Sequence, residues 1–137
     1  MIIPQTRTLT RASVHHSYIG IGLAVARGFA DKGYSVIIGG RDTQKPRSSG
    51  LRHIQIDVTD EQPVMAAVDE SGPIDILVAN AGAAFTAPAI RTPLSEWEKM
   101  LAVNLTGVFL CARAFAPQMI NKGWGRIITV ASTASIR

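Results

Sequence analysis

Short apolar runs separated by amphipathic segments mark out the secondary structure of this chain of 137 residues. Runs of this kind, bounded by Gly, Pro or Asn, are typical of strands buried on both faces of a parallel sheet. The clearest run is residues 76–79, which is followed at once by Asn80, Ala81 and Gly82. Further strands are predicted at residues 6–14, 34–38, 53–56 and 126–130, of which residues 6–14 are the least apolar.

Helical spacing of apolar residues occurs between these runs. A stripe at positions i, i+3, i+4, i+7 and i+8 predicts one buried helix face, and Gly33 follows it as a C-terminal stop. The members of this stripe are Ile21, Ala24, Val25, Gly28 and Phe29. A second helix is predicted after Thr59, which forms a weak capping box with Gln62. Its inward-facing residues are expected to be Val64, Ala67 and Val68.

A longer helix is predicted before the last strand. Ser95 is expected to cap it, with Glu96 and Glu98 in the first turn, and Gly123 to end it. The residues predicted to share its buried face are Trp97, Met100, Leu101, Asn104, Leu105, Val108, Ala112 and Phe115.

Alternation of strand and helix predicts the fold class. Right-handed crossovers would place about five strands in a doubly wound, Rossmann-like parallel sheet with helices on both faces, incomplete at its C-terminal side. We expect one partial domain over residues 1–137, with residues 1–19 irregular. Ligands bind such sheets at the carboxyl ends of the strands, where the small residues Ala81 and Gly82 leave backbone accessible.

Composition narrows the class of protein. Hydrophobic residues make up 47% of the chain, which argues against disorder, and no uninterrupted apolar run reaches the length of a membrane span. The net charge is +4, concentrated in residues 1–52. The basic residues punctuate apolar segments and do not line one helix, so nucleic-acid binding is not expected.

Targeting signals are sparse. The only cysteine, Cys111, fits a reducing compartment such as the cytoplasm, and we expect it to be a small buried helix residue and not a nucleophile. The first sixteen residues contain Arg, Ser and Thr but no acid, as in organelle transit peptides, so an organelle matrix is the alternative to an irregular N-terminus.

Five features together resemble the short-chain dehydrogenase/reductase family, over residues from about 20 to 137. They are Gly20-Ile21-Gly22 opening the first helix, Asp57-Val58, Asn80-Ala81-Gly82, Asn104 in the long helix, and Ser132 after the last strand. The combination of Asn-Ala-Gly, Val103-Asn104 and Gly-Arg-Ile-Ile-x-Val-x-Ser is specific, whereas Gly-x-Gly alone is weak.

The resemblance implies a nucleotide site. Gly20, Ile21 and Gly22 would receive the pyrophosphate at a helix N-terminus, or serve only tight helix–strand packing. Asp57 and Val58 would hold the adenine, through a carboxylate bond to the exocyclic amine and a backbone bond to a ring nitrogen; Asp57 could also cap a helix.

The resemblance also implies roles for residues that follow the predicted strands at residues 76–79 and 126–130, and for one residue of the long helix. Asn80 would tie the predicted strand at residues 76–79 to its neighbour, while Ala81 and Gly82 would pass beneath the cofactor. Asn104 would hold a relay water, or be a satisfied core amide, and Ser132 would bond the substrate carbonyl, or be a turn serine.

The glycine loop departs from the family pattern of Thr-Gly, three residues, then Gly-x-Gly. Thr10-Arg11-Ala12-Ser13 resembles the usual opening, with Arg11 in place of the first glycine and residues 14–19 as an insertion. Arginine does not adopt a glycine-only turn cheaply, so this reading predicts weakened pyrophosphate binding.

Arg41 follows the second strand, where the adenosine ribose should lie. An arginine there pairs with a 2′-phosphate, so Arg41, with Lys45 or Arg47 behind it, favours NADP. The neighbouring Asp42 keeps NAD open.

Hydride transfer between nicotinamide and a small carbonyl or alcohol substrate is the implied activity. The family's proton donor is a Tyr with a Lys four residues later, but Gly22 and Ile38 stand four residues after Tyr18 and Tyr34. We therefore expect a chain truncated before that motif. An inactive nucleotide-binding or partner-binding fragment is the alternative. The open edge of the last strand predicts self-association, as a homo-oligomer if folded.

Overall fold

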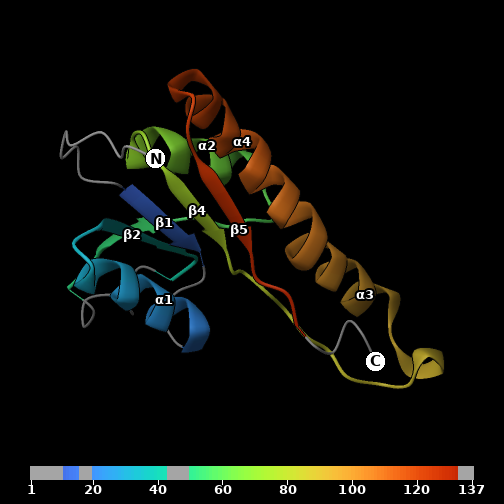
Figure 1. Cartoon of the computed structure of the whole chain (residues 1–137). Coiled ribbons are helices and arrows are strands. Elements are labelled where there is room, and N and C mark those ends of the chain that lie inside the picture. The colour runs from blue at the N-terminus through green and yellow to red at the C-terminus, as the bar shows by residue number, and fades with distance from the viewer. Residues whose placement is uncertain (1–10, 16–19, 43–49, 133–137) are drawn as a thin grey trace.

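The computed structural model describes residues 11–15, 20–42 and 50–132, which form a five-stranded parallel sheet with helices on both faces (Figure 1). The strands are β1 (Arg11–His15), β2 (Ser35–Gly40), β3 (Arg52–Gln55), β4 (Ile76–Ala79) and β5 (Arg126–Thr129). The helices are α1 (Gly20–Asp31), α2 (Glu61–Ser71), the 3-10 turn η2 (Ala89–Arg91), α3 (Leu94–Leu101), the π-helical η3 (Ala102–Thr106) and α4 (Gly107–Lys122).

The order of strands in the sheet is β3-β2-β1-β4-β5. Chain order runs in one direction from β1 to β3 and in the other from β4 to β5, so it reverses between β1 and β4. This is the doubly wound arrangement predicted from the sequence, and the reversal creates a crevice at the carboxyl ends of the strands.

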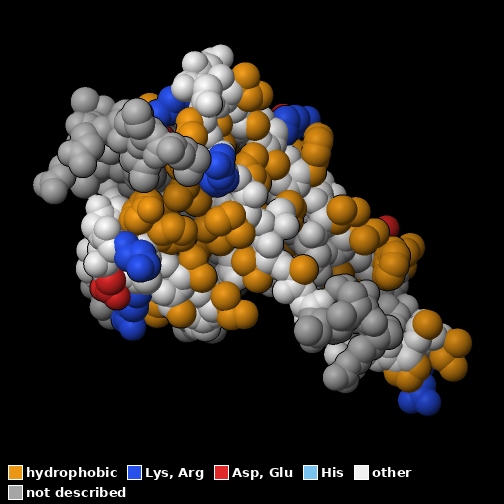
Figure 2. Space-filling model, viewed as in Figure 1, with side chains coloured by type: hydrophobic (Ala, Val, Ile, Leu, Met, Phe, Trp, Pro, Cys, Tyr) orange, Lys and Arg blue, Asp and Glu red, His pale blue; other side chains and the backbone are white. Residues whose placement is uncertain are grey.

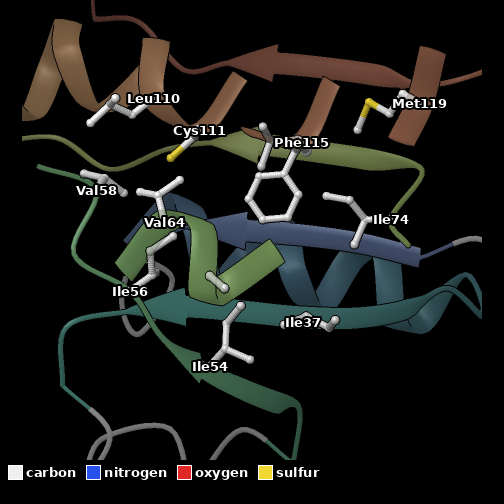
Figure 3. Packing of buried hydrophobic residues seen from close by; sticks show 12 residues of the cluster. Ile37, Ile54, Ile56, Val58, Val64, Ile74, Leu110, Cys111, Phe115 and Met119 are labelled. Carbon is white, nitrogen blue, oxygen red and sulfur yellow. The ribbon is translucent and has the colours of Figure 1, made fainter. Parts of the chain in front are cut away.

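Two apolar clusters hold the layers together. On one face of the sheet, Ala26 of α1 packs with Val14, Ile38 and Val78. On the other face, α2 and α4 cover a larger cluster that is centred on the fully buried Phe115 (Figure 3).

Strand β1 contains residues 11–14 of the predicted strand and extends one residue further, to His15. Arg11 is its exposed first residue, and the next four residues through His15 are buried. Of the predicted strand, residues 6–10 lie outside the described residues. His15-His16 therefore take the place of Thr-Gly, three residues before Gly20, and the predicted insertion and the loop position of Arg11 are wrong.

Strand β2 is longer than predicted because Gly39 and Gly40 belong to it and do not end it. A Cβ atom on Gly39 would lie 2.9 Å from Ile56 Cγ2 and 3.1 Å from His15 Cδ2. Glycine is needed here for close packing inside the sheet, and not for a turn.

The buried face of α1 is rotated from the predicted one. Ile21, Ala24 and Gly28 are exposed, whereas Gly22 and Ala26 are buried. These two small residues, four positions apart, let the helix approach the sheet closely. The spacing of the apolar residues did not reveal this close approach. Val25 and Phe29 do pack against the cluster, as expected, and Gly33 ends the helix with φ 81°.

Helix α2 is capped by Asp60 and not by Thr59. The Asp60 carboxylate accepts a hydrogen bond from Gln62 N, at 3.0 Å. Thr59 instead donates to Asp57, so its hydroxyl is engaged before the helix begins. Val64 and Ala67 are buried, as predicted.

The long helix is continuous from α3 through η3 to α4, and its buried face differs from the predicted stripe. The residues that face the sheet are Gly107, Leu110, Cys111, Phe115 and Met119. Trp97, Leu101 and Leu105 are exposed, because α3 projects beyond the sheet (Figure 1) and the π-helical turn shifts the faces. The predicted cap is also wrong, since the helix begins at Leu94, after Pro93. The C-terminal stop is confirmed at Gly123, with φ 73°.

Length and composition would allow the run Leu94–Lys122 to cross a membrane, with a mean hydropathy of 1.5 and 17% of the window buried. Isolated polar residues interrupt this run, so the sequence contains no uninterrupted apolar stretch of that length. Core helices of soluble proteins pass the same test, and one such helix is weak evidence for a membrane span. Apolar side chains gather along this helix on the face shown in Figure 2. Leu105 and Phe109 are among the exposed apolar residues of the helix.

Asp75 joins three strands and one helix where β4 begins. One carboxylate oxygen accepts from Arg11 N at 2.9 Å, and the other pairs with Lys122 at the end of α4. Its backbone N–H donates to Arg11 O and its carbonyl accepts from Arg126 N, each at 2.9 Å. The Asp75 side chain is only 8% exposed, so little water can reach it to replace a hydrogen-bond partner that is lost.

Replacing Asp75 with Ala is expected to lower the free energy of unfolding by about 2 kcal/mol, because it removes the acceptor of a partly buried hydrogen bond from Arg11 N and also removes an ion pair. Urea unfolding followed by circular dichroism measures this. Asp69, exposed on α2, is the matched control, and D69A should change stability by less than about 0.5 kcal/mol. Equal effects of the two substitutions would show that the junction is not a stabilising feature.

Candidate nucleotide-binding site

A hollow of 210 Å³ opens at the carboxyl ends of the strands. Four segments line it: Gly40 and Arg41 at the end of β2, residues 56–59 after β3, residues 81–83 after β4, and Lys99, Ala102 and Val103 from the long helix. Five of the residues proposed from the sequence thus share one cavity, namely Arg41, Asp57, Val58, Ala81 and Gly82.

Asp57 presents an ionised carboxylate to this hollow. Partial burial raises the pKa of Asp57, but hydrogen bonds from Thr59 and the nearby charge of Arg41 outweigh that effect and bring the pKa below its ordinary value. Thr59 N and Oγ1 donate to Oδ1 at 3.0 and 2.7 Å. Both bonds from Thr59 end on Oδ1, so the carboxylate keeps acceptor capacity at Oδ2 for a ligand amine.

Arg41 lines the hollow from the end of β2, near enough to Asp57 for its charge to lower the pKa of that carboxyl. Its carbonyl accepts from Gln55 Nε2 at 3.4 Å, which ties the end of β2 to β3. Its side chain also borders a neighbouring 360 Å³ hollow next to Pro63. Lys45 and Arg47, named beside it from the sequence, lie outside the described residues.

Asn80 links β4 to β1. Its Nδ2 atom donates to the carbonyl of His15 at 3.3 Å, across the point where strand order reverses. The amide side chain thereby holds together the two strand ends between which a ligand would enter.

His15 is fully buried beneath this site, and sequence reasoning passed over it. Its ring lies 5.8 Å from that of Phe115, at an interplanar angle of 60°. Neither ring nitrogen has a hydrogen-bond partner among the described residues, and burial lowers the pKa of His15 to about 4. The imidazole is therefore neutral at physiological pH and fills space as an aromatic core residue.

Asn104 lies in the π-helical turn and fastens the segment after β4. Its Oδ1 accepts from Ala83 N at 2.9 Å, and its Nδ2 donates to Ala83 O at 2.8 Å. The side chain is exposed and not on an apolar face, so the expected buried position is wrong. Both groups of the Asn104 side-chain amide bond to Ala83. A water would therefore bind to the backbone of Asn104 or to the hydrogen-bonding positions that remain on that amide.

The other proposed residues lie outside the hollow. Gly20, Ile21 and Gly22 form the first turn of α1, where Gly20 has φ 63° and Gly22 is buried. Ser132 follows β5 and is exposed, while Thr133 and Ser135 lie outside the described residues. No cluster of three or more His, Cys, Asp or Glu side chains that could hold a metal occurs in the part of the chain that the structure describes.

Cys111 is buried against the sheet, as expected. Burial raises the pKa of its thiol to about 12, so the thiol stays protonated and is a packing residue.

Comparison with known proteins places the chain in a family. The family model for short chain dehydrogenases matches residues 16–137. The chain belongs to the short chain dehydrogenase family. The family spacing of the glycine loop is met by His15-His16, followed by three residues and then Gly20-Ile21-Gly22.

Relatives of this short chain dehydrogenase include an uncharacterized oxidoreductase of Thermotoga maritima, 35% identical over 86% of the chain and 51% of the relative. The D-beta-hydroxybutyrate dehydrogenase of Rhizobium meliloti is 38% identical over 88% of the chain and 53% of the relative. The chain thus spans about half the length of these relatives.

Solved structures agree with the fold. Serine dehydrogenase from Escherichia coli superposes with a TM-score of 0.86 at 29% identity, covering 93% of this chain and 64% of that one. A gluconate 5-dehydrogenase from Burkholderia cenocepacia J2315, in complex with NADP and tartrate, gives a TM-score of 0.83 at 39% identity, covering 90% of this chain and 53% of that one.

Acidification tests the burial of His15. The imidazole titrates near pH 6.5 when unfolded but only at about 4 when folded, so the unfolded chain takes up the proton first. The free energy of unfolding should therefore fall as the pH drops from 6.5 toward 4, by roughly 3 kcal/mol for this group.

The measurement is urea unfolding at several pH values in that window, for the native chain and H15L. Leucine does not titrate, so the decline should be smaller in the variant by about the same 3 kcal/mol. Parallel declines in both proteins would show that His15 is not held neutral in the fold.

Proposed function

We propose that this chain is the cofactor-binding part of an NAD(P)-dependent oxidoreductase, which transfers a hydride between nicotinamide and a small carbonyl or alcohol substrate. The observation that supports this most directly is the hollow at the reversal of strand order, which an ionised Asp57, the Val58 backbone and Arg41 border together. The names of its relatives, such as gluconate 5-dehydrogenase and D-beta-hydroxybutyrate dehydrogenase, point to the same reaction class.

The hollow fits an adenosine in its chemistry. Asp57 offers an acceptor for the exocyclic amine, and apolar walls at Ile56, Val58 and Val103 suit the faces and edges of a base. Gly82 has no side chain to obstruct the backbone, and a Cβ there would already contact Asn104 Oδ1 at 3.5 Å. The proposed domain is a partial Rossmann domain that covers the whole chain.

We assign the 2′-phosphate of NADP to Arg41, with NAD as the alternative because Asp42 adjoins it. The guanidinium provides paired donors for phosphate oxygens, whereas an acid would select the two hydroxyls of an unphosphorylated ribose. The B. cenocepacia gluconate 5-dehydrogenase structure contains NADP, which supports this choice.

The cofactor supplies the hydride when bound, and the residues of this chain orient the reactants. We propose that Gly20, Ile21 and Gly22 receive the pyrophosphate at the N-terminus of α1, and that Asn80 and Ala81 support the strand end beneath the cofactor. Ser132 would donate to the substrate carbonyl, and the Asn104 backbone would hold a relay water while its side chain fixes Ala83.

Proton donation is not assigned to the residues of this sequence. Tyr34 packs edge-on against Phe29 at 5.2 Å, within the apolar cluster under α1, and has no lysine four residues later. Tyr18 lies outside the described residues. This position of Tyr34 supports the alternative function, in which the residues of this sequence bind a nucleotide but do not turn over a substrate.

We further propose a cytoplasmic enzyme that forms a homo-oligomer. All four residues of β5 are exposed, and Leu105, Phe109 and Ile120 expose apolar surface along the long helix. Covering this surface would lower its contact with water, and self-association is one way to do so.

The test is a comparison of NADPH and NADH binding to the native chain and to R41A, by isothermal titration calorimetry. Loss of the guanidinium should weaken NADPH about tenfold, since a charged phosphate loses its partner, and weaken NADH less than about twofold. R27A, an exposed arginine on α1, is the matched control and should change neither constant.

Equal weakening of the two cofactors by R41A would reject the phosphate role of Arg41. Failure of the native chain to bind either cofactor would reject the proposed function itself.

A further inference from the structure

Lys99 lines the same hollow as Asp57 and Val58 but comes from the facing wall, one turn of helix before Val103. It has the spacing i, i+4 from Val103, and residues at that spacing lie on one helix face. This lysine is the one cation that the long helix contributes to the described lining of the hollow.

The position of this helix face is fixed by a contact further along it. A Cβ atom on Gly107 would lie 2.8 Å from Val58 Cγ2 and 3.2 Å from the Val58 carbonyl, so the helix rests directly on the segment after β3. A rise of 1.5 Å per residue places Lys99 about 12 Å from this contact along the helix. Val103 therefore covers the inner part of the hollow and Lys99 its outer rim.

The lysine is held loosely. Its side chain is 61% exposed, and its Nζ lies 3.7 Å from Glu96 Oε2 on the same helix. An exposed pair at this separation is weak, so a bound ligand can compete for the ammonium at small cost.

An adenine placed by Asp57 and Val58 leaves acceptors unused. With the exocyclic amine on the carboxylate and one ring nitrogen on the backbone, further ring nitrogens remain as acceptors on the base. An ammonium group has three donors and no acceptor, and a flexible four-carbon stem that packs against apolar surface.

We propose that Lys99 is a specificity-determining residue of this site, which closes the outer rim over the adenine base and donates from Nζ to a ring nitrogen. This inference rests on the proposed nucleotide-binding function and names a further contact within it. Because the 2′-phosphate is assigned to Arg41, the role proposed for Lys99 is recognition of the base, which NADH, NADPH and AMP have in common, and not of the 2′-phosphate.

The experiment measures the dissociation constants of AMP, NADH, NADPH and reduced nicotinamide mononucleotide for the native chain and K99M. Methionine keeps an apolar stem and removes the ammonium. We expect the three adenine-containing ligands to weaken by one common factor of about five, as for loss of one partly solvated charged hydrogen bond. The mononucleotide, which has no adenine, should be unaffected.

Two further variants sharpen the result. E96Q frees the ammonium from its ion pair and should tighten the adenine-containing ligands by up to about twofold, opposite in sign to K99M. K32M, an exposed lysine after α1, is the matched control and should change nothing.

Unchanged binding by K99M, with the native affinity intact, would overturn the role of Lys99 and leave the proposed function standing. Weakening confined to NADPH would overturn it too, and would assign the lysine to the phosphate. Absence of any adenine-nucleotide binding by the native chain would reject both this inference and the proposed function.

Discussion

The pairing of β1 with β4 is the constraint on which the rest of the structure depends. The two strands run parallel with Ala12 opposite Ile76 and Val14 opposite Val78, although more than sixty residues separate them in sequence. Chain order reverses at this pair, so the connections leave the sheet in opposite directions and a crevice opens at the carboxyl ends. Asp75 fastens the start of the pair, and the Asn80 amide fastens its end to His15.

The helices complete the site because they pack on the same strand ends. Gly107 lets α4 rest on Val58, and Asn104 holds Ala83 through both of its amide groups. The backbone that would surround an adenosine is therefore positioned by the fold, with the ligand groups of Asp57 and Arg41 at its border. Preorganisation of this kind lowers the entropy that a ligand must lose on binding.

Much of this fold could be predicted from sequence, since β4 and β5 are apolar runs with clear ends and four of the five strands were found close to their observed positions. The first strand was predicted, but not its end at His15, because Ser13 and His15 are polar residues that are fully buried, and their burial depends on neighbours distant in sequence. The same limit applied to α1 and to the long helix, where small residues such as Gly22 and Gly107 face the sheet while some large apolar ones, such as Ile21 and Leu105, are exposed. Among site residues, Asp57 and Gly82 were accessible through motif spacing, whereas Lys99 belongs to no motif and the burial of the His15 side chain emerges only from the packing.

The central claim is that the crevice beside β1 and β4 is a preformed adenosine site. The most direct test is a crystal structure of this chain grown with NADPH. We predict the adenine between the segment after β3 and the long helix, with its exocyclic amine within hydrogen-bonding distance of an Asp57 carboxylate oxygen and a ring nitrogen facing Val58 N. An adenosine bound elsewhere on the chain, or a crevice that stays empty at saturating NADPH, would contradict the account.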